Sequence, residues 1–290
     1  MHAHPFAIKP LTLHFAILIC EVLPPPIAAL RGPFDQIFQT FFDRAAKRFL
    51  EDHADQYPGQ EKPQVKTTPY NVTEGQLPDA GDLEGIDALV VTGSTAGAYE
   101  DIEWVKKLGA FLQNTYRDHP KVKIFGSCFG HQIINQSLFS HTGGLHVRQN
   151  PQGWELGVQE IAITPKFAAC FPRQFQSSRT ISASPTRIQL QLSHQDAVVV
   201  TQKTQLPPEC VEMGSSALCS MQGMYVPDRV LTFQAHPEFD RAVNGACINW
   251  IGESTWPAEV TREYLRMADQ DDDAGLMGEV VMEFLLRGSK

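Results

Sequence analysis

The amino-acid sequence predicts an α/β fold whose sheet is mainly parallel, with a mixed edge and helices on both faces. Through the first half of the chain, short apolar runs alternate with amphipathic stretches, which is the pattern of parallel strands joined by crossover helices. The second half is richer in strand-like runs than in helical ones, so we expect a mixed sheet edge there. The 290 residues are 42% hydrophobic and 20% charged, which is ordinary for a globular protein.

Hydrophobic periodicity predicts the individual elements. In the first half, we expect strands at 15–20, 65–68, 86–91 and 122–125, a Pro-rich turn at 24–26, and helices at 34–50 and 102–116. In the second half, we expect strands at 156–163, 188–192, 197–201 and 230–234, and helices at 257–267 and 278–286. Strands and helices therefore alternate as a parallel sheet requires.

The sequence contains no internal repeat and no strong shift in composition, so it predicts a single domain over 1–290. A stretch rich in Ser, Arg, Phe and Pro indicates an insertion near 165–187. Residues 240–290 are expected to form a C-terminal helical extension.

Charge and cysteine content exclude several classes of protein. The net charge of −9 argues against binding to nucleic acid or to an anionic membrane surface. The six cysteines form no C-x-x-C pair, so we expect neither a disulfide framework nor a metal site, but reduced thiols in a cytoplasmic protein. His14 and Glu21 interrupt the apolar run at 11–23, which argues against a signal peptide. The chain has no P-loop, and we expect no cofactor.

A candidate nucleophile stands between two glycines in the sequence G-S-C-F-G at 126–130, where a predicted strand meets a helix. This is the layout of a nucleophile elbow, a sharp turn that holds the nucleophile in strained backbone geometry. The turn also places the Cys128 thiol at a helix N-terminus, where the helix dipole favours the thiolate. The alternative interpretation is a buried structural cysteine.

A candidate base follows the strand predicted at 230–234, in the sequence F-Q-A-H-P-E at 233–238. In an extended segment residues i and i+2 point the same way, so the Glu238 carboxylate can orient the His236 ring. A cysteine nucleophile needs a base that removes its proton and later protonates the leaving amine, and that base needs a partner to fix its tautomer. Taken alone, the segment could also be a surface turn.

Together these motifs resemble those of the class I glutamine amidotransferase family, and within it the stand-alone members that are similar to the glutaminase half of GMP synthase. The nucleophile motif extends through G-S-C-F-G-H-Q at 126–132, and Q-A-H-P-E at 234–238 matches the His/Glu motif. V-T-G-S at 91–94 resembles the oxyanion loop, S-H-Q-D at 193–196 resembles a segment that lines the substrate pocket, and G-W-E-L-G at 153–157 is similar to a stretch of the stand-alone members. The resemblance runs to Glu238 in the family's order and implies a flavodoxin-like fold.

The resemblance implies a catalytic triad at three positions of this chain. Cys128 would be the nucleophile, His236 the general base and then the general acid, and Glu238 the carboxylate that orients the imidazole.

The resemblance also implies a set of substrate-binding residues. The backbone N–H groups of Gly93 and Phe129 would stabilise the oxyanion of the tetrahedral intermediate. Gln132 would contact the glutamyl group. His194 and Asp196 would line the pocket, although a His-x-Asp at a strand end can equally brace a loop.

Three functions remain open at this point. The first is a free-standing hydrolase that cleaves a γ-glutamyl amide, in a γ-glutamyl peptide, a glutathione conjugate or glutamine, through a γ-glutamyl thioester. The second is a glutaminase subunit that delivers ammonia to a separate synthetase. The third, from another class, is a non-catalytic regulatory or binding module on the same fold, against which the complete triad counts.

Overall fold

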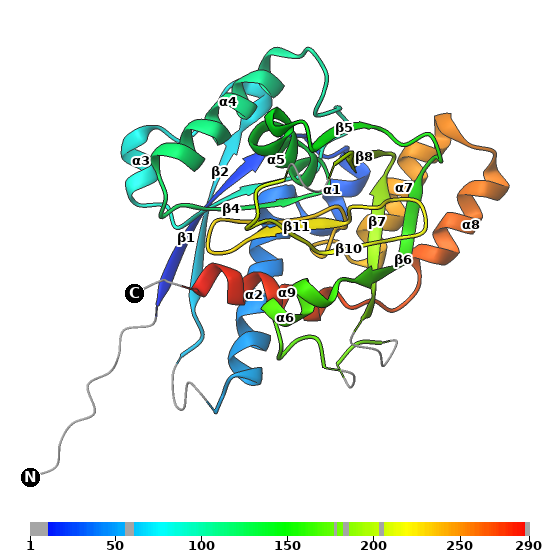
Figure 1. Ribbon diagram of the computed structural model, residues 1–290. Helices are drawn as coiled ribbons and strands as arrows, with labels where there is room; N and C mark the ends of the chain where they lie inside the picture. Colours follow the sequence, from blue (N-terminus) through cyan, green and yellow to red (C-terminus); the bar gives the residue numbers. More distant parts are fainter. Residues whose placement is uncertain (1–10, 56–60, 177–178, 182–185, 203–205, 288–290) are drawn as a thin grey trace, which may run out of the picture.

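The structure is a computed structural model that describes residues 11–55, 61–176, 179–181, 186–202 and 206–287 (Figure 1). Within these ranges a central seven-stranded sheet has the order β2-β1-β3-β4-β12-β11-β9. Its strands are β1 (Thr12–Ile19), β2 (Gln64–Asn71), β3 (Ala88–Val91), β4 (Lys123–Ser127), β9 (Val211–Glu212), β11 (Gly223–Val226) and β12 (Val230–Phe233).

The pairing of these strands confirms the predicted sheet. Strands β2, β1, β3, β4 and β12 are parallel to one another, whereas β11 and β9 are added to the edge in antiparallel pairing. The order of the five parallel strands is that of a doubly wound, flavodoxin-like sheet. In such a sheet the ligand site lies at the carboxyl ends of the strands.

Two smaller sheets flank the central one. The first has the order β10-β6-β7 and the second pairs β5 with β8, all antiparallel. Their strands are β5 (Leu145–Gln149), β6 (Glu155–Ile163), β7 (Arg187–His194), β8 (Asp196–Val200) and β10 (Gly214–Ser215).

Helices cover both faces of the central sheet. They are α1 (Pro25–Arg31), α2 (Phe34–Asp52), α3 (Ala80–Glu84), α4 (Glu103–Asp118), α5 (Phe129–Phe139), α6 (Pro165–Cys170), α7 (Arg241–Thr255), α8 (Ala258–Ala268) and α9 (Ala274–Leu286), with 3₁₀ turns at Val72–Glu74 and Ser140–Thr142. In the view of Figure 1, α3, α4 and α5 lie above the sheet and α2 and α9 below it.

The alternation of side chains along the strands produces two hydrophobic cores. In β1, Phe15 and Ile17 belong to the cluster that contains α2 and α9, whereas Ala16 and Leu18 belong to the cluster that contains α4 and α5. All four side chains are buried. The sheet is therefore covered on both sides, as its run of consecutive apolar residues requires.

One detail differs from the expectations. The Pro-rich turn predicted at 24–26 is wrong, because α1 begins at Pro25, and proline is tolerated in the first turn of a helix, where its missing N–H has no partner to lose. The stretch expected as an insertion includes α6, whose Phe167 is fully buried beside Phe171 and Tyr225 in the main core. Part of that stretch, 177–178 and 182–185, lies outside the described residues.

Membrane insertion was also examined through helix length and hydropathy. In the described part of the chain, no helix is both long enough and apolar enough to cross a bilayer.

Candidate active site

The sequence motifs meet at one edge of the central sheet. Cys128 follows the last residue of β4, His236 comes shortly after β12, and Gly93 shortly after β3. These three strands are neighbours and run parallel. Their carboxyl ends therefore lie together, at the edge where doubly wound sheets bind ligands.

The backbone of Cys128 has the strained geometry of a nucleophile elbow. Its φ of 51° and ψ of −110° are unusual for a residue other than glycine. The turn is held by a hydrogen bond of 2.8 Å from the Cys128 N–H to the carbonyl oxygen of Phe233. The Cys128 sulfur lies 3.7 Å from the carbonyl oxygen of Ser193, and α5 begins at the next residue.

The glycines around Cys128 allow a close approach of strand and helix. A Cβ atom added to Gly126 would lie 2.6 Å from Cδ1 of Ile134, and one added to Gly130 would lie 2.2 Å from the carbonyl oxygen of Val91. Neither distance is compatible with a larger side chain. These glycines therefore let β4 and α5 approach each other closely beside the Cys128 turn.

The imidazole of His236 is held on several sides. Its Nδ1 lies 2.8 Å from Oε1 of Glu238, and the same oxygen accepts a hydrogen bond of 2.8 Å from the Ser127 hydroxyl. The Phe239 ring stacks on the imidazole with ring centroids 4.1 Å apart and an interplanar angle of 4°. The backbone N–H of His236 donates a hydrogen bond of 2.9 Å to the backbone carbonyl oxygen of Gln191, which ties this segment to β7.

Charge at the site determines the protonation of His236. Burial alone would lower the pKa of this imidazole, but the charges of Cys128 and Glu238 and the hydrogen bonds to both side chains raise the pKa to about 10. These groups therefore favour the cationic form of His236, whose ring interacts with the Cys128 side chain and with the Glu238 carboxylate.

Burial makes the thiols of the other five cysteines less reactive. It raises the pKa of each of these thiols, to about 12 for Cys210, Cys219 and Cys247, and above the usual value for Cys170 and Cys20. All six cysteines are free thiols.

Gly93 brings the backbone of the β3 loop against the reacting groups. A Cβ atom at this position would lie 3.0 Å from Cε1 of His236 and 3.8 Å from Cβ of Cys128. Glu21, after β1, anchors the loop by accepting hydrogen bonds from the Thr95 backbone N–H and from the Ser94 hydroxyl, the latter at 3.3 Å. The loop is thus fixed where its N–H groups can face Cys128.

The remaining pocket residues form a hydrogen-bonded group. The amide nitrogen of Gln132 donates to the carbonyl oxygen of Asp196 at 3.0 Å and to Oε1 of Gln234 at 3.2 Å. Nδ1 of His194 lies 2.9 Å from the same carbonyl oxygen, and its Nε2 lies 3.2 Å from the buried carboxylate of Glu155. Nδ1 of His194 is therefore hydrogen-bonded within the protein, whereas Nε2 lies at ion-pair distance from Glu155 without the geometry of a hydrogen bond.

The Asp196 carboxylate, unlike its carbonyl, has a single side-chain contact. Its Oδ1 accepts a hydrogen bond of 3.4 Å from the Tyr99 hydroxyl. Burial raises the pKa of this carboxyl group above its ordinary value. A polar ligand group can replace so long a hydrogen bond.

A cavity of about 90 Å³ adjoins Cys128 and His236. Glu21, Ser193 and the Gly93 loop contribute polar groups to its walls, and most of the remaining lining is apolar and comes from the β1–α1 connection, α1, α2 and α7. The apolar lining includes Leu23, Pro24, Ile27, Phe34, Phe239, Trp250 and Ile251. Trp250 is 49% exposed and stands at the rim.

Several of these residues were missed by the sequence analysis. Ser127 and Phe239 each stand directly beside a motif residue, and this adjacency was the available signal. Ser193 is part of the S-H-Q-D segment at 193–196, whereas Trp250 reaches the site only through the packing of α7, for which no local pattern exists.

Within the described ranges, no group of three or more His, Cys, Asp or Glu side chains is arranged as a set of metal ligands.

Comparison with known proteins agrees with this geometry. The family model described as glutamine amidotransferase class-I matches residues 58–248, and the chain belongs to this family. It is 28% identical to a glutamine amidotransferase-like protein of Schizosaccharomyces pombe over 94% of this chain and 98% of the relative. It is 30% identical to gamma-glutamyl peptidase 3 of Arabidopsis thaliana over 60% of this chain and 63% of that protein.

A solved structure supports the fold. The glutamine amidotransferase of Thermotoga maritima superimposes with a TM-score of 0.61, covering 96% of this chain and 99% of its own, at 16% sequence identity. At this identity the likeness shows the shared architecture.

Proposed function

We propose that this chain is a hydrolase that cleaves a γ-glutamyl amide bond through a thioester on Cys128. The observation that carries the proposal is the strained cysteine at the end of β4, beside an imidazole that Glu238 holds at 2.8 Å. Sequence similarity to proteins named gamma-glutamyl peptidases supports the substrate class.

In the first half of the reaction, the Cys128 thiolate attacks the γ-carbonyl carbon while the His236 imidazolium stands ready as an acid. The N–H groups of Gly93 and Phe129 stabilise the oxyanion that forms. Collapse of the tetrahedral intermediate breaks the C–N bond, and His236 gives its proton to the leaving amine. Neutral His236, oriented by Glu238, then removes a proton from water, which attacks the thioester and releases glutamate.

The glutamyl end of the substrate is assigned to the group around Asp196. Its carboxylate can accept from the α-ammonium group of the substrate in place of the long Tyr99 contact. Gln132 lies within the same hydrogen-bonded group. His194 supports this group through Glu155 instead of touching the substrate.

The apolar cavity beside Cys128 favours an organic leaving amine. Side chains such as Leu23, Ile27 and Trp250 gain from burying apolar surface of a leaving group, whereas ammonia released from glutamine offers them none. This supports a γ-glutamyl peptide or a glutathione conjugate as substrate. The second candidate is a glutaminase subunit serving a separate synthetase, which the amidotransferase character of the family supports.

Other parts of the proposal follow from the sequence. The mechanism uses no cofactor and no metal, and its partners are small γ-glutamyl molecules, with a synthetase as partner in the second case. A reduced nucleophile suits a cytoplasmic enzyme. We take 1–290 as a single domain, with the insertion near 165–187 and the extension 240–290.

The decisive experiment is incubation of the purified protein with glutamine, glutathione and S-benzylglutathione, with released glutamate measured by mass spectrometry. We expect release from the peptides that is faster than from glutamine and is lost in Cys128→Ala. Glutamate formation only from glutamine, and only after a synthetase is added, would favour the second candidate. No release under either condition would overturn both and leave the non-catalytic module.

Intact-protein mass after a rapid acid quench tests the intermediate. An adduct of glutamyl mass should appear on the wild-type protein and be absent from Cys128→Ala. Release of glutamate by Cys128→Ala at the wild-type rate would show that another residue activates water directly.

A further inference from the structure

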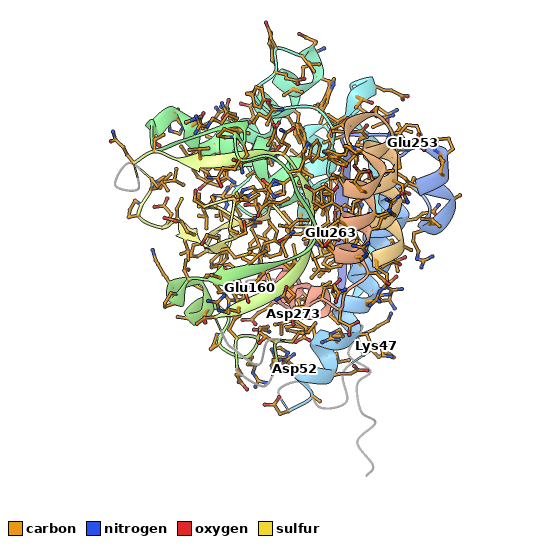
Figure 2. The ribbon with its side chains drawn as sticks, turned by 90° about the vertical axis from the view of Figure 1, so that its right-hand side faces the viewer. Lys47, Asp52, Glu160, Glu253, Glu263 and Asp273 are labelled. Atoms are coloured by element: carbon orange, nitrogen blue, oxygen red, sulfur yellow. The ribbon has the colours of Figure 1, made fainter. Side chains whose placement is uncertain are left out.

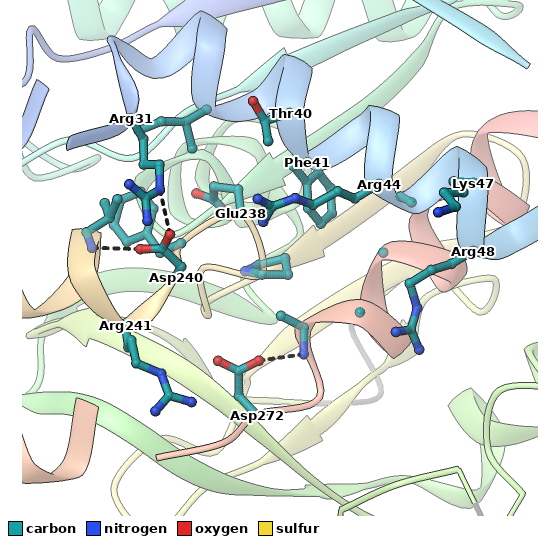
Figure 3. Close-up of a pocket in the computed structure, with 18 of the residues that line it drawn as sticks. Arg31, Thr40, Phe41, Arg44, Lys47, Arg48, Glu238, Asp240, Arg241 and Asp272 are labelled. Carbon is teal, nitrogen blue, oxygen red and sulfur yellow. Dashed lines mark hydrogen bonds and ion pairs between the residues drawn. The ribbon is translucent and has the colours of Figure 1, made fainter. Parts of the chain in front are cut away.

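A second and larger cavity lies on the other side of the catalytic carboxylate. Its volume is about 710 Å³, and its lining includes Glu238 but neither Cys128 nor His236. Figure 3 shows α2 along one wall and the first turns of α7 and α9 on the others. Glu238 is therefore the member of the proposed triad that borders this cavity, with its side chain beneath the cavity wall.

The two carboxylate oxygens of Glu238 differ in their surroundings. Oε1 accepts hydrogen bonds from the Ser127 hydroxyl and from His236. Oε2 is buried without a hydrogen-bond donor among the described residues, and the Glu238 side chain is fully excluded from solvent. A buried carboxylate oxygen without a donor is unfavourable, so a donor in the adjoining cavity would stabilise it.

Most cations that line the cavity are already paired. Arg31 bonds to Asp240 at 2.8 Å, Arg241 bonds to Asp271 at 2.7 Å, and Arg48 bonds to the buried Glu279 at 3.1 Å. Lys47 lies 3.8 Å from Glu51 at the exposed surface of α2.

Arg44 is the exception. It lines the same cavity, and within the described residues no carboxylate pairs with it and no side chain hydrogen-bonds to its guanidinium. Figure 3 shows its side chain extending from α2 in the direction of Glu238. No interaction joins the two groups in this structure, and the cavity leaves the guanidinium room to move.

We propose that Arg44 is a positioning residue, whose guanidinium closes onto Oε2 of Glu238 and holds the carboxylate so that Oε1 remains on His236. The inference rests on the proposed function in one respect, that Glu238 orients the catalytic imidazole. Arg44 does not touch the substrate. It acts through Glu238, from the cavity that the substrate does not enter.

The charges that face Glu238 determine the expected direction of the pH effect. His236 and Asp240 belong to the same segment as Glu238. Helices α1 and α2 contribute Arg31, Arg44 and Arg48. The start of α7 contributes Arg241, and the segment before α9 contributes Asp271 and Asp272. The other arginines are neutralised by their carboxylate partners. Loss of Arg44 therefore makes the potential at the triad more negative, which favours protonated His236 and moves its titration to higher pH.

The test is Arg44→Gln, with kcat, KM and the pH dependence of kcat/KM measured on the γ-glutamyl peptide that the wild-type enzyme hydrolyses fastest. We expect kcat to fall about tenfold, the loss that one hydrogen bond to a charged group represents. KM should stay close to the wild-type value, because the cavity is separate from the substrate pocket. The alkaline limb of the profile should move to higher pH, and Arg44→Lys should restore part of the rate because it retains the charge.

The matched control is Lys47→Gln, which removes a cation from the same helix. The Lys47 side chain is 71% exposed and lies at the outer edge of the molecule (Figure 2), so both kcat and the pH profile should be unchanged. Thermal melting of each variant verifies that it is folded. A folded Arg44→Gln with wild-type kcat and pH profile would overturn the proposal, as would an effect of equal size in Lys47→Gln.

A second readout separates this inference from the proposed function. The pH dependence of Cys128 alkylation by iodoacetamide, followed by mass spectrometry, requires no substrate. If no γ-glutamyl substrate is turned over, the proposed function fails, yet a profile that moves to higher pH in Arg44→Gln and not in Lys47→Gln would still support the coupling of Arg44 to the triad. If Arg44→Gln does not fold, Arg44→Lys is measured in its place: a kcat below the wild-type value in the folded variant supports the proposal, and a wild-type kcat overturns it.

Discussion

Replacing Phe239 by leucine should lower the pKa of His236. The Phe239 ring lies parallel to the imidazole, with centroids 4.1 Å apart, and Phe34 stacks behind it at 6.1 Å. A cation over an aromatic face gains about 1 kcal/mol at a partly desolvated site, and 1.36 kcal/mol corresponds to one pH unit. Loss of the ring should therefore lower the pKa of His236 by about 0.7 pH units, because the charged form loses the stabilisation.

The measurement is an NMR titration of the His236 Cε1–H signal in wild-type protein and variant. The matched control is Phe38→Leu, since Phe38 is also buried and contacts Phe34 without touching the imidazole. Both variants should lose at most about 1.5 kcal/mol of stability, because leucine retains most of the volume. An unchanged His236 titration in Phe239→Leu, or an equal change in Phe38→Leu, would refute the role of the stacked ring.

Three further predictions follow from the site. Cys128→Ala should abolish turnover and leave the melting temperature nearly unchanged, because Cβ is retained and the sulfur is small; a large fall in melting temperature would contradict this. Gly130→Ala should destabilise the fold by more than about 2 kcal/mol in urea unfolding, because its Cβ would lie 2.2 Å from the Val91 oxygen, whereas Gly245→Ala, with no contact below 3.6 Å, should be neutral or slightly stabilising. The value of kcat/KM should fall as the pH rises through about 10, where His236 loses its proton. The raised pKa also stabilises the folded state: this stabilisation is complete below about pH 6.5 and should be lost as the pH rises from there to about 10, in urea unfolding at each pH.

The fold could be predicted from the sequence because its strands are marked locally. The apolar run of β3 reflects burial on both faces of the sheet, and the helical spacing of the phenylalanines in α2 reflects packing against one of those faces. Very short strands such as Val211–Glu212 and Gly214–Ser215 could not be predicted, because two residues carry no period. The start of α1 was hidden because its prolines also favour a turn.

The site was predictable where adjacent residues carry the chemistry. Glu238 reaches His236 from two positions away, so the pair is visible in the sequence. The role of His194 required the structure, because its partner Glu155 lies on another strand. The cavity faced by Arg44 likewise forms only when three helices pack together.

The separation of the triad along the chain has a consequence for biosynthesis. Ser127 and Glu238 are hydrogen-bonded although 111 positions separate them, and the pairing of β12 with β4 joins segments similarly distant along the chain. Parallel pairing between such distant segments is slow compared with the formation of local structure. During synthesis on the ribosome, Cys128 therefore emerges long before His236 and Glu238 and remains an ordinary thiol until then. The proposed nucleophile thus gains its proposed base and orienting carboxylate only when β12 pairs with β4, late in the synthesis of the chain.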